Sequence, residues 1–364
     1  MEFDDLKPEV RAFISSLRGY GVRNAVLSEF AATARPTASP RVRAVHARGN
    51  LGTTHISGPL SDFATGYAPG MYIADDMNPP IPTSHWSDQF QKRQALDVVT
   101  PVETLMSGSG KANEVDYKTT TDSYAVLDRG LMEWVTWREV NDADDVLAPR
   151  EEAVENVMNK VLLDAEIRVA DFLDTNTNYG TAQRITATAA WSDTTNGDPV
   201  LDIHAALAAM AVGNQSSEIR CAIALELWQE AQRHPRLTGL LGANDRGLVK
   251  ASDFEEFFGV RLFITDAEKN TAARDVAGTL TRARIWDTDK VRFVRVPVGK
   301  PTKNSMMFAG RFRIRQAGQL DVGVYEWTDA SRGAGEGSIG VKCTRSESDP
   351  KSLQNDCGAI ITGC

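Results

Sequence analysis

Residues 107–112, Ser-Gly-Ser-Gly-Lys-Ala, form the stretch of this chain that comes nearest to a known chemical motif. They resemble the end of a phosphate-binding loop, in which glycine amides and a lysine hold phosphate. The leading glycine of that motif is missing, and Ala112 stands where a serine or threonine would bind magnesium. The pattern therefore favours the flexible tip of a hairpin over a nucleotide site.

Two other residue classes could bind metals or act as bases. Residues 141–145, Asn-Asp-Ala-Asp-Asp, have acidic spacing similar to a calcium loop, but the glycine and glutamate that such a loop needs do not follow. The histidines (His46, His55, His85, His204 and His234) are scattered and match no zinc motif. The chain also lacks a serine nucleophile elbow. We expect no catalytic residue, cofactor or metal ion.

The four cysteines are Cys221, Cys343, Cys357 and Cys364, without a CxxC pair. Cys221 lies in an apolar run, which predicts a small buried hydrophobic side chain. The other three lie near the C-terminus, where a disulfide could form after lysis. Free thiols are the favoured state in a reducing compartment.

The distribution of charged residues along the chain is more informative about possible partners than the net charge. A net charge of −9 argues against a dedicated nucleic-acid binder. Residues 31–50 nevertheless carry Arg35, Arg41, Arg43 and Arg48 without an acidic residue, whereas residues 149–174 are rich in Asp and Glu. This pattern suits contacts between copies of the chain, and a solvated flexible arm is the alternative.

The N-terminal part has no core of its own. No apolar run is long enough to span a membrane, and the start lacks a secretion signal, so a cytoplasmic protein is expected. After a short helical pattern (Val10, Phe13, Ile14 and Leu17), residues 31–70 have no sustained periodicity. Such an arm needs a partner surface to become ordered.

Residues 94–127 predict an extended two-stranded hairpin. Apolar residues lie on both sides of the glycine-rich tip, within a Thr-rich context that favours strands. An isolated hairpin is marginally stable in water, so it should lie on another surface.

A long helix should follow the hairpin. Pro149 suits its first turn, apolar residues recur at spacings of three and four, and turn formers end it near Asp174. Asp164 and Arg168 form a supporting pair one turn apart.

The remainder predicts an α/β section and returning strands. We expect a helix from Asp198 to Gly213, a strand at 219–224, a helix ending at His234-Pro235, a helix at 253–258 capped by Ser252 and Glu255, and a strand at 260–264. Residues 282–286 and 291–296 should form a hairpin, and residues 306–315 should pair with 320–327.

The order of these elements, with several short motifs, resembles the major capsid proteins of tailed bacteriophages, which have the α+β Hong Kong 97-like fold. The matching motifs are Trp191-Ser-Asp with Asp198-Pro and Asp202-Ile, Leu227-Trp with His234-Pro-Arg-Leu, Phe257-Phe-Gly-Val followed by Arg-Leu-Phe-Ile264, and Ile285-Trp-Asp, where Asp287 replaces the usual glycine. The resemblance covers roughly residues 70–330.

The resemblance implies a division of the chain: an N-terminal arm (1–70), an extended loop, called the E-loop, with flanking P-domain strands (71–146), a P-domain with the spine helix (147–204), an A-domain (205–298), returning P-domain strands (299–330) and a C-terminal extension (331–364). It implies self-assembly into hexamers and pentamers of an icosahedral shell that encloses double-stranded DNA without specific binding.

Contacts between copies are expected from two groups of residues. These are Arg35, Arg41, Arg43 and Arg48 in the arm, and Ser107, Gly108, Gly110, Lys111 and Asn113 at the hairpin tip. A separate scaffolding protein, a portal and a decoration protein are the other candidate partners. The expected location is the virion, after assembly in the host cytoplasm.

Two alternatives stay open from sequence. An encapsulin-type nanocompartment has the same fold, and a soluble α/β enzyme with an unrecognised site belongs to a different class. Some relatives cross-link through a lysine in the hairpin, and Lys111 and Lys118 lie in suitable regions. No asparagine or glutamate partner is identified, so we predict no isopeptide bond.

Overall fold

The computed structural model describes residues 55–67, 70–93, 101, 104–105, 119–143, 148–210, 217–241, 247–271, 281–299, 306–314, 322–332 and 337–364. The chain divides into two units, residues 1–49 and 50–364, and all described residues belong to the second. The predicted arm therefore lies outside the described residues as far as residue 54.

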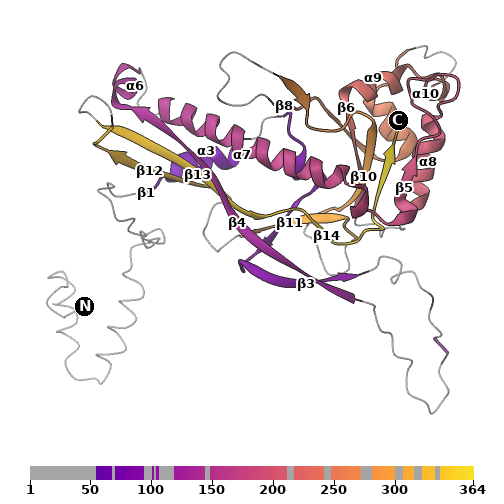
Figure 1. Cartoon of the computed structure of the whole chain (residues 1–364), viewed down its shortest axis with the longest axis horizontal. Coiled ribbons are helices and arrows are strands. Elements are labelled where there is room, and N and C mark those ends of the chain that lie inside the picture. Colours follow the sequence, from indigo (N-terminus) through magenta and orange to yellow (C-terminus); the bar gives the residue numbers. More distant parts are fainter. Residues whose placement is uncertain are drawn as a thin grey trace, which may run out of the picture. The chain divides into compact units, whose positions relative to one another are not determined.

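Helix α7 (Ala148–Asp174) is the predicted long helix, with Pro149 in its first turn. Its apolar stripe is buried in two successive clusters. Val154, Val157 and Val161 lie in a cluster with the larger sheet, and Val169 and Leu173 lie in a cluster with the smaller one. Full burial of such side chains stabilises the fold by about 1.5–3 kcal/mol each. The helix therefore joins the two sheets (Figure 1).

The larger sheet is mostly antiparallel. Its strands are β1 (His55–Ile56), β2 (Pro80–Thr83), β3 (Ser87–Arg93), β4 (Thr119–Thr136), β11 (Ala309–Ile314), β12 (Gly323–Asp329), β13 (Ser338–Ser348) and β14 (Lys351–Ser352). Strand β13 lies between β12 and β4, and the β4–β13 ladder runs from Val126 to Thr136. Helix α3 (Gly58–Gly66) and the first half of α7 pack on one face of these strands.

The smaller sheet has five strands and is covered on both faces. Its order is β5 (Arg184–Thr186), β15 (Gly358–Thr362), β10 (Lys290–Pro297), β6 (Ser217–Ala224) and β7 (Arg261–Thr265). One face packs on α8 (Pro199–Ala209), α9 (Leu225–Arg233) and α11 (Ala251–Phe258). The other face packs on the end of α7.

The other described elements are short. They are α4 (Ala74–Met77), α6 (Trp137–Asp142), α10 (Pro235–Thr238), the 3-10 turns η2 (Asn176–Asn178) and η3 (Thr181–Gln183), and the paired strands β8 (Glu268–Asn270) and β9 (Arg282–Arg284).

Several local predictions are confirmed. Asp198 caps α8 by accepting a hydrogen bond from the Leu201 amide at 3.1 Å. Arg168 Nε and Asp164 Oδ2 lie 3.0 Å apart on α7. Cys221 is fully buried in the smaller sheet. Helix α8 ends at Ala209, earlier than predicted, because Met210 is extended.

Two predicted strand pairings are wrong. Strand β9 pairs with β8, whereas β10 pairs with β6 and β15, so residues 282–296 do not form a hairpin. Strands β11 and β12 both pair with β13 instead of with each other. The partners of β10, which are β6 and β15, and the partner of β11, which is β13, are distant in sequence, so a turn pattern cannot reveal them.

The C-terminal residues are not an extension. Strand β13 is central in the larger sheet, and β15 lies inside the smaller one. The alternating side chains Ile339, Val341 and Cys343 of β13 are buried. Two charged residues of the same strand, Arg345 and Glu347, are also buried and form an ion pair with each other.

Two smaller predictions are also wrong. Helix α3 falls within the predicted arm, yet Leu60 and Ala64 are buried against the chain's own core. Helix α11 is capped by Asp253, which accepts the Lys250 amide at 3.1 Å, whereas Glu255 accepts the Leu262 amide at 2.8 Å.

Candidate assembly surface

Strands β3 and β4 form the root of the predicted hairpin. They pair antiparallel from Ser87 with Ala125 to Arg93 with Thr119. Lys92 Nζ and Asp122 Oδ2 form an ion pair across the two strands at 2.6 Å. A two-stranded excursion is therefore confirmed at its root, and residues 106–118, which include the tip, lie outside the described residues.

An aromatic cluster holds this root to the larger sheet. Phe312 of β11 stacks on Tyr124 of β4 with ring centroids 3.9 Å apart, and it lies 5.1 Å from Phe90 of β3. The Tyr124 hydroxyl and Thr83 Oγ1 are 2.7 Å apart, in hydrogen-bonding distance. These contacts give the hairpin root an apolar attachment that an isolated hairpin lacks.

Next to this root lies a cluster of charged side chains, here called the charge cluster, in which Glu347 and three arginines are buried and Asp75 is 49% exposed. Its members are Asp75 of α4, Arg168 of α7, Arg311 and Arg313 of β11, and Arg345 and Glu347 of β13. Glu347 is 1% exposed and accepts from Arg168 Nη2 at 2.6 Å. It also contacts Arg313 Nη2 at 3.1 Å, and Arg311 Nη1 and Arg345 Nε at 3.3 Å each.

Asp75 supplies the second acidic group of the charge cluster. It pairs with Arg311, and Arg345 Nη2 donates to it at 2.6 Å. Burial acts to raise the pKa of Asp75 and Glu347, but the neighbouring guanidinium groups outweigh it and lower both pKa values. Both carboxylates thus stay ionised and tie two helices to two strands at the hairpin root.

Two further buried acids connect α7 to the smaller sheet. Burial raises the pKa of Glu166, which accepts from Trp286 Nε1 and from the Ala74 amide, each at 2.7 Å. Burial also raises the pKa of Asp174, which pairs with the fully buried Arg292. These acids have structural partners that fix the end of α7.

The face of the larger sheet opposite α7 is only partly covered. It carries Ile56, Met132, Trp134, Tyr325, Trp327 and Lys342, here called the open sheet face. Met132 is 54% exposed and Ile56 is 42% exposed. Trp134 and Trp327 flank Gly340 in register and meet edge to face, with centroids 5.4 Å apart.

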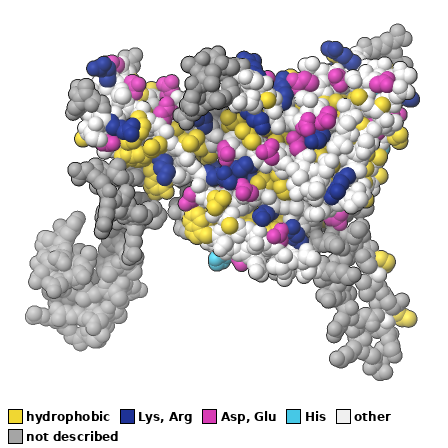
Figure 2. All heavy atoms as spheres, viewed as in Figure 1, with side chains coloured by type: hydrophobic (Ala, Val, Ile, Leu, Met, Phe, Trp, Pro, Cys, Tyr) yellow, Lys and Arg dark blue, Asp and Glu magenta, His cyan; other side chains and the backbone are white. Residues whose placement is uncertain are grey.

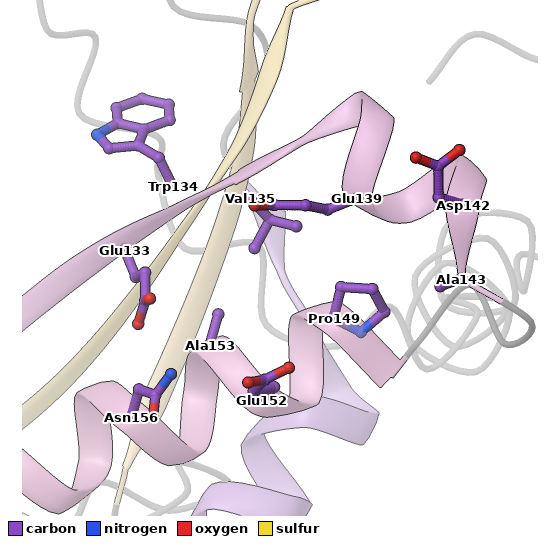
Figure 3. Close-up of a pocket in the computed structure, with 10 residues that line it drawn as sticks. All are labelled: Glu133, Trp134, Val135, Glu139, Asp142, Ala143, Pro149, Glu152, Ala153 and Asn156. Atoms are coloured by element: carbon purple, nitrogen blue, oxygen red, sulfur yellow. The ribbon is translucent and has the colours of Figure 1, made fainter.

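Gly340 makes the tryptophan contact possible. A Cβ at this position would lie 2.6 Å from the Trp327 ring and 3.0 Å from the Trp134 ring. Figure 3 shows Trp134 on the opposite side of β4 from Glu133 and α7. Figure 2 shows hydrophobic side chains gathered over β12 and β13, and charges of both signs spread over much of the viewed surface.

A groove of about 360 Å³ lies between β4, α6 and the start of α7 (Figure 3). Its acidic lining residues are Glu133, Glu139, Asp142 and Glu152. Glu139 is engaged in capping α6, where it accepts the Thr136 amide at 2.8 Å. Within the described residues, no group of His, Cys, Asp and Glu has an arrangement that could hold a metal ion.

The residues predicted to contact other copies are not among those described. Arg35, Arg41, Arg43, Arg48, Ser107, Gly108, Gly110, Lys111 and Asn113 lie outside the described ranges. Sequence reasoning missed the charge cluster, whose members come from distant parts of the chain. A local signal existed in β11, where Arg311 and Arg313 alternate with the apolar Phe312 and Ile314.

Comparisons with known proteins give two informative matches. No family model matches the chain. Over 235 residues, which are 63% of this chain and 74% of the relative, the chain is 26% identical to the major capsid protein of Pseudomonas phage JBD67. A phage-related protein from Bordetella bronchiseptica has the same fold, with a TM-score of 0.66 and 17% identity over 85% of this chain and 98% of that one.

A third match is weaker in structure. The capsid of cyanophage P-SCSP1u aligns with a TM-score of 0.47 and 14% identity over 80% of this chain and 88% of that one. Among the described residues, no helix is long and apolar enough to cross a membrane.

Proposed function

We infer that this chain is the major capsid protein of a tailed phage, a subunit that assembles with copies of itself into an icosahedral shell. The identity of 26% with a phage major capsid protein carries this conclusion. The family resemblance and the α+β fold that were predicted from the sequence are thereby confirmed. Ion pairs of the charge cluster, and the pair of Asp174 with Arg292, hold elements of the fold together, which supports a structural role.

The shell encloses the double-stranded DNA genome without specific binding. The net charge of −9 supports this view, because specific phosphate binding needs a basic surface. The subunits form hexamers and pentamers, and a separate scaffolding protein and a portal take part in assembly, with a decoration protein as a further partner. The protein resides in the virion after assembly in the host cytoplasm.

The segments of the chain have different roles in the proposed shell. The hairpin between β3 and β4 is the E-loop, which lies on an adjacent subunit, and the larger sheet with α7 is the P-domain. The smaller sheet, within residues 205–298 together with β5 and β15, is the A-domain. The buried root of the hairpin supports this division, since the aromatic and charge clusters fix that root to the P-domain.

Contacts between copies come from the hairpin tip and the basic arm. Ser107, Gly108, Gly110, Lys111 and Asn113 belong to the tip. The arm contributes Arg35, Arg41, Arg43 and Arg48. The arginines of the arm have no acidic residue within residues 31–50, which suits contact with a neighbouring acidic body.

Deletion of residues 107–113 tests this assignment. The shortened subunit should fold, because the hairpin root keeps its own contacts, and it should assemble poorly. Thermal unfolding followed by circular dichroism checks folding, and sedimentation with electron microscopy checks assembly. Replacement of the same residues by a Gly-Ser segment of equal length separates the effect of sequence from that of length. Normal particles from the deletion would contradict the proposed contacts.

A further inference from the structure

We propose that Asp193 protects Asn196 from spontaneous deamidation, so that the turn of residues 193–198 is a latent site of chemical modification. Asn196-Gly197 is the only Asn-Gly pair in the sequence, and it lies between the Trp191-Ser-Asp motif and helix α8. Asn196 is exposed, whereas Gly197 is buried. Neither residue takes part in the proposed function, so the chemistry of this pair is independent of shell assembly.

Deamidation at an Asn-Gly pair is a reaction within the chain. The Gly197 nitrogen attacks the side-chain carbonyl carbon of Asn196, the bond from this carbon to the side-chain nitrogen breaks, and ammonia leaves with the proton of Gly197. Water then opens the resulting cyclic imide at either of its carbonyl groups and gives aspartate or isoaspartate. Glycine favours the attack because no Cβ hinders the approach of its nitrogen.

The turn holds both of the groups that would react. The Gly197 amide donates to the Asp193 carbonyl oxygen at 2.9 Å. The Asn196 side-chain nitrogen donates to Asp193 Oδ2 at 2.8 Å, and the Asn196 backbone amide donates to Asp193 Oδ1 at 3.2 Å. The attacking nitrogen and the side chain under attack are therefore both bonded to Asp193, and the reaction has to disturb these bonds.

Asp193 is itself fixed in this position. Its Oδ1 also accepts the Thr195 amide at 2.9 Å, and its own amide donates to the Ala190 carbonyl oxygen at 2.9 Å. The hydrogen bond from the Asn196 side chain is the main cause that lowers the pKa of Asp193, so the carboxylate is ionised at neutral pH. A negative charge in the same turn opposes the loss of a proton from the Gly197 nitrogen.

The fold requires glycine at position 197, so the vulnerable pair cannot be removed there. A Cβ on Gly197 would lie 2.7 Å from the Asp193 carbonyl oxygen and 2.8 Å from the Ala190 carbonyl oxygen. Isoaspartate would insert a carbon atom into the backbone directly before this crowded position, and aspartate would place a second carboxylate beside Asp193. Because Asp198 caps α8 at the end of the same turn, either product would loosen the start of that helix.

Deamidation rates measured by mass spectrometry test the proposal. Trypsin releases residues 185–220 as one peptide, and tandem spectra assign the change to Asn196 within it. The full chain is incubated at neutral pH, either folded or unfolded in guanidinium chloride. The folded chain should deamidate at Asn196 on the order of tenfold more slowly than the unfolded chain, as expected from the hydrogen bonds that the reaction disturbs.

Two variants separate the contacts of Asp193 from other properties of the turn. Asp193→Ala removes the side-chain acceptors of Asn196, so the folded variant should deamidate roughly tenfold faster than the unchanged folded chain. Asp198→Asn is the matched control, because it removes a carboxylate of the same turn that accepts the Leu201 amide instead of Asn196. Asparagine caps helices as well as aspartate does, and the following Pro199 has no amide hydrogen with which to react. This control should keep the rate of the unchanged chain.

Equal rates in the folded and unfolded chain would overturn the proposal, and this comparison needs no variant. An unchanged rate in Asp193→Ala, or an equal increase in Asp198→Asn, would also overturn it. Near-ultraviolet circular dichroism checks that each variant is folded. If Asp193→Ala is unfolded, Asp193→Asn replaces it, because asparagine keeps an oxygen for the backbone amides of Thr195 and Asn196 and removes the acceptor of the Asn196 side chain.

Discussion

Substitution of Glu347 by glutamine probes the charge cluster most directly. Glu347 is 1% exposed, and its carboxylate contacts Arg168, Arg311, Arg313 and Arg345 at distances between 2.6 and 3.3 Å. Glutamine keeps the shape of the side chain and removes its charge. Four guanidinium groups would then share Asp75 as the remaining acid at the centre of the cluster.

The expected cost follows from the burial of the group. Removal of one partner from a buried ion pair costs about 3–5 kcal/mol, because it leaves an uncompensated buried charge. Asp122→Asn is the matched control, since Asp122 forms a single ion pair with Lys92 and its side chain is 36% exposed. An exposed pair of this kind contributes about 0.2–1 kcal/mol.

Urea denaturation of the unassembled subunit at pH 7, followed by tryptophan fluorescence, measures both effects. Glu347→Gln should lower the free energy of unfolding by about 3–5 kcal/mol, and Asp122→Asn by less than about 1 kcal/mol. If Glu347→Gln costs no more than the control, the charge cluster does not hold the hairpin root to the spine helix.

Three further substitutions test other parts of the structure. Asp75→Asn should destabilise at pH 7 and should cost less at a pH below the lowered pKa of Asp75. The lowered pKa means that the stabilisation by Asp75, present above the ordinary value of about 4, is lost as the pH falls through the lowered value. An equal cost at both pH values would contradict this. Gly340→Val places side-chain atoms against the Trp327 ring, so it should lower the free energy of unfolding by about 1–3 kcal/mol. It should also change the near-UV circular dichroism of the tryptophan pair. An unchanged spectrum would show that the two rings do not meet. Phe312→Ala removes the ring stacked on Tyr124, so it should lower the free energy of unfolding by about 3–5 kcal/mol. Proteolysis at the hairpin root should become faster. Cleavage at the unchanged rate would mean that other contacts hold the root.

Local patterns in the sequence predicted the long helix well. Helix α7 has strong periodicity, a proline in its first turn and turn formers after its end, and all three features act over neighbouring residues. The start of α8 was predictable for the same reason, because Asp198 caps the helix that follows it.

Strand pairing was less predictable, because it joins residues that are far apart. Strand β13 lies between β4 and β12 and also pairs with β11, and β15 lies between β5 and β10, so both sheets depend on the last residues of the chain. Because β13 contains polar residues, its central position in the larger sheet was not predictable from the sequence. Arg345 and Glu347 appear suited to solvent in the sequence, yet the charge cluster buries them.

The candidate assembly surface was predictable only in outline. The hairpin was indicated by its glycine-rich tip and its Thr-rich strand, but its attachment through Phe312 and Tyr124 joins distant elements. The open sheet face depends on the register that brings Trp134, Gly340 and Trp327 side by side. A change of register by one residue would turn these side chains toward the core.

The size of the native assembly tests the central conclusion most directly. The chain should form closed icosahedral shells, seen by electron microscopy and by light scattering of the purified particle under native conditions. Exclusively monomers or small oligomers under the same conditions would contradict the assignment as a shell subunit.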